Sequence, residues 1–462
     1  MDKYGIYIST ILFASILGIT IYLTNVKLTN NNITSFVITI GAIFLLRDYI
    51  AARAQLVTFI LFVLELYFIE QFLRTKYKRY VIGLIIIPIM LANLHVAVFP
   101  FYFILYLPYL GEYFICIMSN LEVYKIRSKI KKLHEKLKNC NAEEKINIRE
   151  QIYKLIDRKK VLKKRAKNNR EKAYKIKIEK NNNIKALIIV LLICLLTGFL
   201  TPLGTTPYTY LVKTMQGNTT HNISEHLPLT LVQNVFFMCT LLIFIIILMF
   251  TDTKIRLSDL FMLGGLILLT FYTRRQESMF IIAGCFILNR LVCSMFEKYD
   301  KGGPNKIEEK MTDVFGIITT ICIVLSISIV NYKPKIDDSF INEKDYPVMA
   351  ADYILHHLDI KNIRLYNEYN YGSYLLFRGI PVFIDSRADL YSPEFNEGVN
   401  VFSDFLNISD LEVDNMEEMF DKYQFTHLIM YKKSKLGKFL SQNPEKYEQL
   451  YEDNNFRIFE RK

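Results

Sequence analysis

Apolar residues in this 462-residue chain are gathered into long blocks that are separated by charged segments. The clearest block runs from Leu231 to Phe250 and is interrupted only by Gln233, Asn234 and Thr240. A helix that crosses the hydrocarbon core of a bilayer needs about 20 consecutive, mostly apolar residues. A soluble chain in which 22% of the residues are charged would distribute them more evenly. The sequence therefore predicts an α-helical polytopic membrane protein.

About ten such blocks occur along the chain, so about ten membrane spans are expected. They lie near residues 4–24, 32–46, 54–72, 80–93, 97–118, 184–203, 230–250, 258–273, 277–294 and 313–331. Only four polar residues, 274–277, separate the eighth block from the ninth. So short a separation predicts two helices that are joined by a tight turn.

The distribution of lysine and arginine predicts the orientation of these spans in a plasma membrane. Segment 121–180 holds 22 Lys and Arg against 8 Asp and Glu, a net charge of +14, so it is expected in the cytoplasm. Counting spans outward from it puts the basic stretches 74–79, 254–256 and 298–310 on the same side. The same count puts the N-terminus and the tail 333–462 outside. The tail has a net charge of −7, as suits a domain away from the anionic inner leaflet.

These patterns divide the chain into four regions. They are a first helix group (1–120), a basic cytoplasmic helical hairpin (121–183), a second helix group (184–332) and an extracytoplasmic α/β domain (333–462). In the hairpin, apolar residues recur at helical spacing on both sides of an interruption at 139–142. Its charge is compatible with binding to anionic lipid or nucleic acid, but a solvated hairpin is the simpler interpretation. It has no base-reading chemistry, so no nucleic-acid partner is expected.

The tail alternates between helix and strand patterns, which predicts a small, mainly parallel sheet with helices on its faces. Helices are expected near 347–358, 373–377, 394–405, 415–422 and 434–441, and strands near 363–366, 382–384, 427–431, 446–451 and 456–460. In such sheets, ligands bind at the C-terminal ends of strands. Two polar clusters fall there, 367–371 and 385–389, and they supply Asn370, Asp385 and Arg387 as candidate binding residues.

The cysteines give no sign of a metal site or a disulfide framework. None of the seven has a CxxC partner, and no cluster in the sequence has the spacing of zinc ligands. The tail contains no cysteine, so no disulfides are expected there. No metal ligands are assigned, and the cofactor stays open, with a divalent metal compatible.

The tail also carries a resemblance to a known group of proteins. The run NEYNYGSYLLFRGIPVFIDSRADLY is similar to the C-terminal pattern Asn-x-x-Trp-Gly-Gly-Tyr-Leu, then Phe-Ile-Asp-Gly-Arg-x-Asp-Leu-Tyr, of a group of large bacterial membrane proteins. Tyr371 stands at the Trp, and Ser373 and Ser386 stand at the second and third Gly. The Asn of the pattern falls on Glu368, and the nearest amides are Asn367 and Asn370. The closing segment YEDNNFRIFERK also fits that group.

The membrane part agrees with this resemblance. ARAQL at 52–56 is similar to the Arg-Pro-Gln-Leu of the group, and LANLHV at 91–96 is similar to its Trp-x-Asn-x-His-Gly. The group resembles glycosyltransferase-C-type enzymes, the fold of protein mannosyltransferases. The resemblance implies transfer of a sugar from a polyprenyl-phosphate donor to a glycan or protein acceptor at the outer membrane face.

One departure from the family pattern concerns the first external loop. Members of that superfamily carry one or two acidic residues there, as catalytic base or metal ligand, and this chain has no such loop near its beginning. The resemblance then implies a shortened, split or inactive member. It also implies a partner subunit that carries the missing segment.

The implied reaction needs a carboxylate to deprotonate the acceptor and cations to hold the phosphate. The carboxylates expected at the outer face are Asp48 and Glu277, which are the candidate bases. The candidate substrate-binding residues there are Arg47, Arg53, His95, Arg274 and Arg275. Arginines at span ends also reach headgroups without any substrate, and an Asp385–Arg387 pair also serves to hold a fold. Glu65 lies inside a span, where a carboxylate is costly.

Three functions from different classes remain open. The first is a membrane glycosyltransferase that acts on lipid-linked sugars. The second is a non-catalytic scaffold or subunit whose external domain binds glycan or protein. The third is a transporter of lipid-linked saccharide, although no inverted repeat is visible among the spans.

Overall fold

The computed structural model describes residues 3–138, 141–216, 223, 225–332 and 341–462. The chain divides into two compact units. The helical unit comprises Met1–Tyr210 and Leu227–Thr320, and the tail unit comprises Leu211–His226 and Ile321–Lys462. The expected domain boundary at residue 333 lies outside the described residues.

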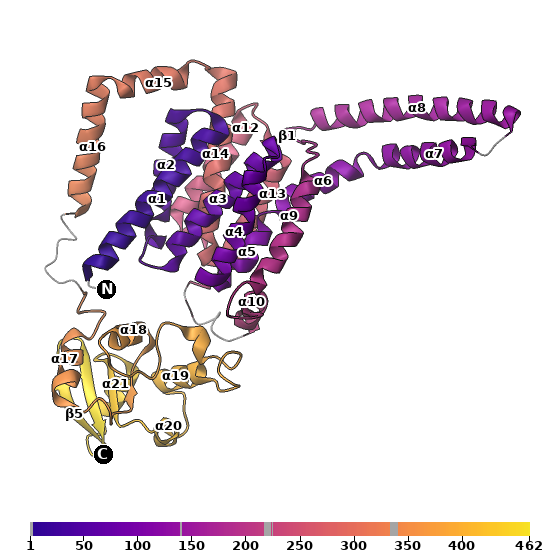
Figure 1. Cartoon of the computed structure of the whole chain (residues 1–462). Helices are drawn as coiled ribbons and strands as arrows, with labels where there is room; N and C mark the ends of the chain where they lie inside the picture. The colour runs from indigo at the N-terminus through magenta and orange to yellow at the C-terminus, as the bar shows by residue number, and fades with distance from the viewer. Residues whose placement is uncertain (1–2, 139–140, 217–222, 224, 333–340) are drawn as a thin grey trace. The chain divides into compact units, whose positions relative to one another are not determined.

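Each apolar block contains a helix. These helices are α1 (Lys3–Thr29), α2 (Asn32–Leu46), α3 (Ala54–Thr75), α4 (Lys78–Leu94), α5 (Phe99–Ile104) with α6 (Leu107–Met118), α9 (Ile184–Leu196), α12 (Val235–Phe250), α13 (Leu257–Tyr272), α14 (Glu277–Tyr299) and α16 (Val314–Tyr332). Figure 1 shows α1, α2, α3 and α14 side by side, and these helices contact one another. The division of α13 from α14 confirms the expected turn.

The number of helices that qualify as spans is smaller than the expected ten. Among the described residues, five are long and apolar enough to cross a membrane, or six if the bent pair α15 (Gly303–Thr312) and α16 counts as one span. Helix α9 with the 3-10 turn that follows it, α12 and α13 are apolar but shorter. The chain is thus mostly helical and carries several helices suited to a bilayer. One further helix, α10 (Thr206–Gln216), lies between the blocks.

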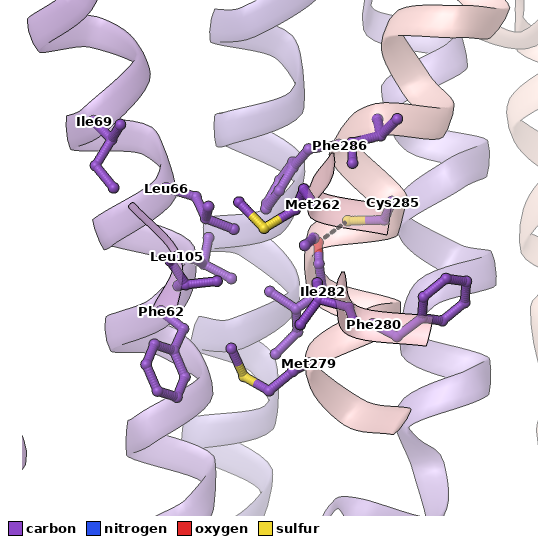
Figure 2. Close-up of a cluster of buried hydrophobic side chains, with 14 of the residues drawn as sticks. Phe62, Leu66, Ile69, Leu105, Met262, Met279, Phe280, Ile282, Cys285 and Phe286 are labelled. Carbon is purple, nitrogen blue, oxygen red and sulfur yellow. Dashed lines mark hydrogen bonds between the residues drawn. The ribbon is translucent and has the colours of Figure 1, made fainter. Parts of the chain in front are cut away.

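Helix α14 occupies the centre of the helical unit. Its residues 279–287 are all buried, so one side of this helix cannot be distinguished from the other by hydropathy. Figure 2 shows Met279 and Ile282 of α14 in the same apolar cluster as Phe62 of α3 and Met262 of α13.

The basic segment 121–180, called the basic arm below, forms the expected helical hairpin. Helices α7 (Leu121–Lys138) and α8 (Ala142–Glu171) pack against each other (Figure 1). Two of the residues at which an interruption is expected, 139 and 140, lie outside the described residues. After α8 the chain forms β1 (Ile176–Lys177), which pairs in parallel with β2 (Ile255–Arg256). The root of the arm is therefore attached to the helical unit.

The basic stretches that the charge count assigns to one side lie at one end of the helical unit. Lys254 donates through Nζ to the carbonyl oxygen of Glu171, at 3.0 Å. Nearby, Asp252 accepts from Lys298 Nζ at 3.0 Å. The side-chain amide of Asn183 donates to Leu73 O at 2.9 Å, which brings the start of α9 to the end of α3. We call this the arm end of the helical unit.

The tail unit contains a four-stranded sheet in the order β3-β4-β6-β5. Its strands are β3 (Leu365–Tyr366), β4 (His427–Tyr431), β5 (Tyr447–Glu452) and β6 (Phe456–Arg461). Only β3 and β4 are parallel, whereas β6 is antiparallel to both β4 and β5. The expectation of a mainly parallel sheet is therefore wrong. Three residues join β5 to β6, and so short a connection permits only an antiparallel hairpin.

No strand forms at 382–384 among the described residues, although one is expected there. The side chain of Asn367 makes the hydrogen bonds that a neighbouring strand would make. The amide of Asn367 accepts from the backbone N–H of Phe383 at 2.8 Å and donates to Ile384 O at 2.7 Å. These are the backbone groups that a neighbouring strand would otherwise pair. The segment therefore packs beside β3 as an irregular stretch.

Helices cover both faces of this sheet. They are α17 (Val348–His357), α18 (Tyr369–Phe377), α19 (Val401–Asp410), α20 (Met416–Tyr423) and α21 (Lys435–Ser441). Leu428 and Met430 belong to one apolar cluster and Ile429 to the other, as alternation along a strand requires. The helix expected at 394–405 begins later, at Val401, because Asn400 caps it through the N–H of Ser403.

The tail unit has its own two apolar clusters, so we expect residues 341–462 to fold when produced alone. Circular dichroism should record a single cooperative thermal transition of this fragment. A gradual, non-cooperative melt would contradict the prediction. In that case, adding back 211–226 is the informative control, because Ile223 packs on one of the two clusters.

Candidate functional site

The carboxylate of Glu277 is fixed at the end of the helical unit opposite the arm end. Glu277 is the first residue of α14 and is only 7% exposed. Its Oε2 atom accepts hydrogen bonds from Tyr49 Oη and from Asn234 Nδ2, each at 2.9 Å. Asn234 is itself held, because its Oδ1 caps α12 through the N–H of Phe237 at 3.3 Å. Three elements far apart in the sequence therefore orient one carboxylate.

Arginines and a second carboxylate surround this group. The backbone N–H of Arg274 donates to Leu227 O at 2.9 Å, and the charges of Arg274 and Asp48 both act on Glu277. The side chain of Asp48 is 80% exposed and lies 3.6 Å from Arg47 Nε. Arg47 stacks on the ring of Phe44 at 4.3 Å. The structure therefore brings Asp48, Glu277 and Arg274 into one cluster.

His95 and Arg275 lie at the same end. His95 ends α4, and its Nδ1 is 3.0 Å from the hydroxyl of Thr58. Arg275 is close enough to act electrostatically on the imidazole. Arg53 is exposed at the start of α3. We call the group Arg47, Asp48, Arg53, His95, Arg274, Arg275 and Glu277 the carboxylate end. Every candidate that the sequence assigned to the membrane part is at this end.

Two of the three candidates in the tail unit, Asp385 and Arg387, form an ion pair. Asp385 is fully buried, and its carboxylate receives Arg387 Nη2 at 2.5 Å and Arg387 Nε at 3.1 Å. Burial alone would raise the pKa of Asp385, but the hydrogen bonds and charge of Arg387 hold it below its ordinary value. The side chain of Asn370 is exposed on α18. This arrangement favours a structural role for the pair, with only the outer edge of Arg387 open to a ligand.

Gly372, in the tail run, is needed for close packing. A Cβ atom at Gly372 would lie 2.0 Å from Ile384 O and 2.9 Å from the Cα of Asp385. The neighbouring hydroxyls of Ser373 and Ser386 are 2.7 Å apart. The two halves of the run therefore pack directly on each other, as a tight structural motif.

Glu368, at the end of β3, gives the tail unit a pH-dependent stability. Burial raises the pKa of Glu368 to about 7. Hydrogen bonds from the Tyr431 backbone and from Ser434 act in the opposite direction but only partly offset the effect of burial. The folded state thus binds this proton more tightly than the unfolded state does. The stabilisation of the folded tail unit by this proton is complete below about pH 4.5 and is lost as the pH rises to about 7. The free energy of unfolding falls by about 3 kcal/mol over this range. Urea unfolding of the tail fragment at pH 5 and 7.5 should record this loss.

Glu368→Gln should flatten that pH dependence, because the amide does not titrate. The matched control is Glu418→Gln, an exposed site on α20, which should keep the wild-type profile. Equal slopes in all three proteins would show that Glu368 is not the group responsible.

Sequence reasoning missed a second cluster of charged residues, at the arm end. Arg256 donates to both oxygens of Glu70, at 2.6 and 3.0 Å, and to Asp259 at 2.8 Å. Arg290 Nη2 donates to the same Asp259 at 2.5 Å, and Tyr109 Oη donates to Glu70 at 2.9 Å. Glu70, Asp259 and Arg290 all stand inside helices of apolar composition. Their position inside apolar helices could have predicted the cluster, because ionisable groups at membrane depth usually pair.

Glu65 lies one turn and a half from Glu70 on α3 but has a different environment. It is fully buried, and neither of its carboxyl oxygens has a hydrogen-bond partner among the described residues. Burying a carboxyl group without a hydrogen-bond partner is costly. Glu65 is thus brought together with none of the other candidates.

No protein-family model and no curated protein matches this chain. Among the described residues, no three His, Cys, Asp or Glu side chains form a group that could hold a metal ion.

Proposed function

We propose that this protein is a membrane glycosyltransferase of the glycosyltransferase-C type that uses a polyprenyl-phosphate sugar as donor. The observation that carries the proposal is the fixed carboxylate of Glu277 beside Arg274 and Arg275. Both hydrogen bonds that Glu277 makes to described residues fall on Oε2, which leaves Oε1 to accept a proton. A fixed base next to cations is what sugar transfer from a phosphate requires.

In the proposed reaction, an acceptor hydroxyl of a glycan or protein attacks the anomeric carbon of the donor. A new C–O bond forms as the bond between that carbon and the phosphate oxygen breaks. The proton of the hydroxyl passes to Glu277 Oε1, or to Asp48 at the exposed rim. The polyprenyl phosphate leaves with its negative charge held by Arg274 and Arg275, and Arg47 and Arg53 extend this cationic surface.

The proposal places the carboxylate end and the tail unit at the outer face of a plasma membrane. An impermeant maleimide should then label a Lys433→Cys variant in intact cells, because Lys433 is exposed in the tail unit. A Lys132→Cys variant in the basic arm is the control and should react only after the cells are opened. Labelling with the opposite pattern would invert the proposed topology.

The direct test is transfer of labelled sugar from polyprenyl-phosphate donors by membranes that contain this chain. Glu277→Gln should abolish transfer, and Asp48→Asn should reduce it if Asp48 shares the role. Glu309→Gln makes the same change of charge on α15, away from the carboxylate end, and should leave transfer unchanged.

The remaining outcomes distinguish the alternatives. Transfer that requires co-expression of a second chain with an acidic outer loop would make this protein one subunit of an enzyme. No transfer under either condition would favour a non-catalytic scaffold. Movement of the lipid-linked saccharide without transfer would favour a transporter.

A further inference from the structure

A cavity of about 400 Å³ lies at the arm end of the helical unit. Its walls come from the last turns of α1 and α3, from α6, from the first turn of α13 and from the second half of α14. One further wall is the chain that follows β1. There Glu179 N–H donates to Glu112 Oε1 at 2.8 Å. Because so many helices begin or end around it, the cavity lies at the depth of lipid headgroups in a membrane that these helices cross.

The deep wall of the cavity leaves one guanidinium edge unused. Arg256 donates four hydrogen bonds through Nε, Nη1 and Nη2 to Glu70 and Asp259, so every one of its nitrogens is engaged. Arg290 donates to Asp259 through Nε and Nη2. Its third nitrogen, Nη1, is 4.0 Å from Glu70, beyond hydrogen-bond distance. A ligand oxygen can therefore bind to Arg290 while the buried ion pairs stay intact.

The rim of the cavity carries both signs of charge. Arg74, Lys177 and Lys254 are exposed cations, and Glu179 and Glu297 are exposed carboxylates. Lys177 Nζ lies 2.7 Å from Glu179 Oε1, so these two charges pair with each other. Around the whole cavity, five basic side chains face five acidic ones. A simple anion would meet those carboxylates, and a simple cation would meet the arginines. A ligand with both charges complements this combination of groups.

We propose that this cavity binds a phosphate ester that also carries a primary ammonium group, as in an aminophospholipid headgroup or free phosphoethanolamine. The phosphate accepts from Arg290 Nη1 and from Arg74 at the rim. The ammonium donates to Glu297, because Glu179 is paired with Lys177. The volume lies within the range of small-ligand sites, and the headgroup depth favours the lipid as its source.

Thermal unfolding of the full chain in detergent tests this proposal. A thiol-reactive dye reports unfolding, because Cys194 and Cys285 are buried in the helical unit. Phosphatidylethanolamine in the micelles should raise the unfolding midpoint by several degrees. Two other lipids should raise the midpoint less. Phosphatidylglycerol has no ammonium group, and the quaternary ammonium of phosphatidylcholine has no N–H to donate. Free phosphoethanolamine distinguishes the two sources of the ligand. If it shifts the midpoint as much as the lipid does, the ligand is soluble; if it causes no shift, the ligand is the lipid.

The variants Arg74→Gln and Glu297→Gln each change one charge at the rim and leave the buried ion pairs untouched. Each should weaken the response to phosphatidylethanolamine about tenfold in apparent affinity. Glu309→Gln repeats the charge change of Glu297→Gln outside the cavity, and it should respond as the wild type does. Equal shifts with all three lipids, or variants that respond like the wild type, would overturn the proposal.

Discussion

Replacing Arg256 by methionine should lower the free energy of unfolding of the helical unit by about 3–5 kcal/mol, because it breaks a buried ion-pair network from one side. Arg256 is the group that neutralises both Glu70 and Asp259. Without it, Arg290 still pairs with Asp259, but its nearest nitrogen is 4.0 Å from Glu70. Glu70 is left as a buried charge with only Tyr109 as a close donor.

Unfolding of the purified chain in detergent, followed with a thiol-reactive dye, measures this effect. Arg127→Met in the exposed face of α7 is the matched control and should stay within about 0.5 kcal/mol of the wild type. Adding Glu70→Gln to Arg256→Met should recover part of the loss, because the unpaired charge is then removed. A variant with the stability of the wild type would show that the network contributes little.

Gly372→Ala should destabilise the tail unit by roughly 3 kcal/mol, the upper part of the range for overpacked sites. The added Cβ would lie 2.0 Å from Ile384 O and 2.8 Å from Asn367 Nδ2. The first contact is with backbone, so a rotamer change cannot relieve it. Separating the two segments would also break the hydrogen bonds between Asn367 and 383–384.

The melt of the tail fragment, followed by circular dichroism, measures this loss. Asn370→Ala, two residues away and exposed on the same helix, is the control and should change stability by less than about 0.5 kcal/mol. If both alanine variants had the melting temperature of the wild type, the close approach at Gly372 would not be a constraint on the fold.

The sequence predicts the helices well because the signal for an apolar helix is local. Every apolar block contains a helix, and the turn at 274–276 lies where the polar residues interrupt the pattern. Which blocks cross a bilayer is harder to predict. Length alone does not separate a short apolar helix such as α12 from a buried core helix, and α14 is buried on most sides.

The charged clusters were predicted only in part, because pairing is not a local property. Glu70 and Arg256 are 186 residues apart in the chain, and no periodicity relates them. The candidates at the carboxylate end were found because topology places them on the same side. Their hydrogen-bond partners, Tyr49 and Asn234, were not found, since a tyrosine and an asparagine at a span end have no distinctive pattern.

The tail shows a different limit. Residues 382–384 have the composition of a strand, and their backbone groups do pair, but with the side chain of Asn367. Propensity reports that a segment prefers extended backbone, and it does not report which partner supplies the hydrogen bonds. The error of a mainly parallel sheet has a similar origin, because strand order depends on long-range packing.

The hydrogen bonds of Asn367 also have a consequence for how sequences related to this one can vary. Its side chain donates a hydrogen bond from Nδ2 and accepts one at Oδ1, and both partners are in neighbouring residues. Aspartate, serine and leucine have no such pair of atoms. Gly372 has no freedom to gain a side chain while Asn367 holds 383–384 in place. Substitutions at these positions should therefore be rare and correlated, whereas Asn370 between them should drift freely. The five-residue spacing from amide to glycine is the part of the run that a search for distant relatives should weight most.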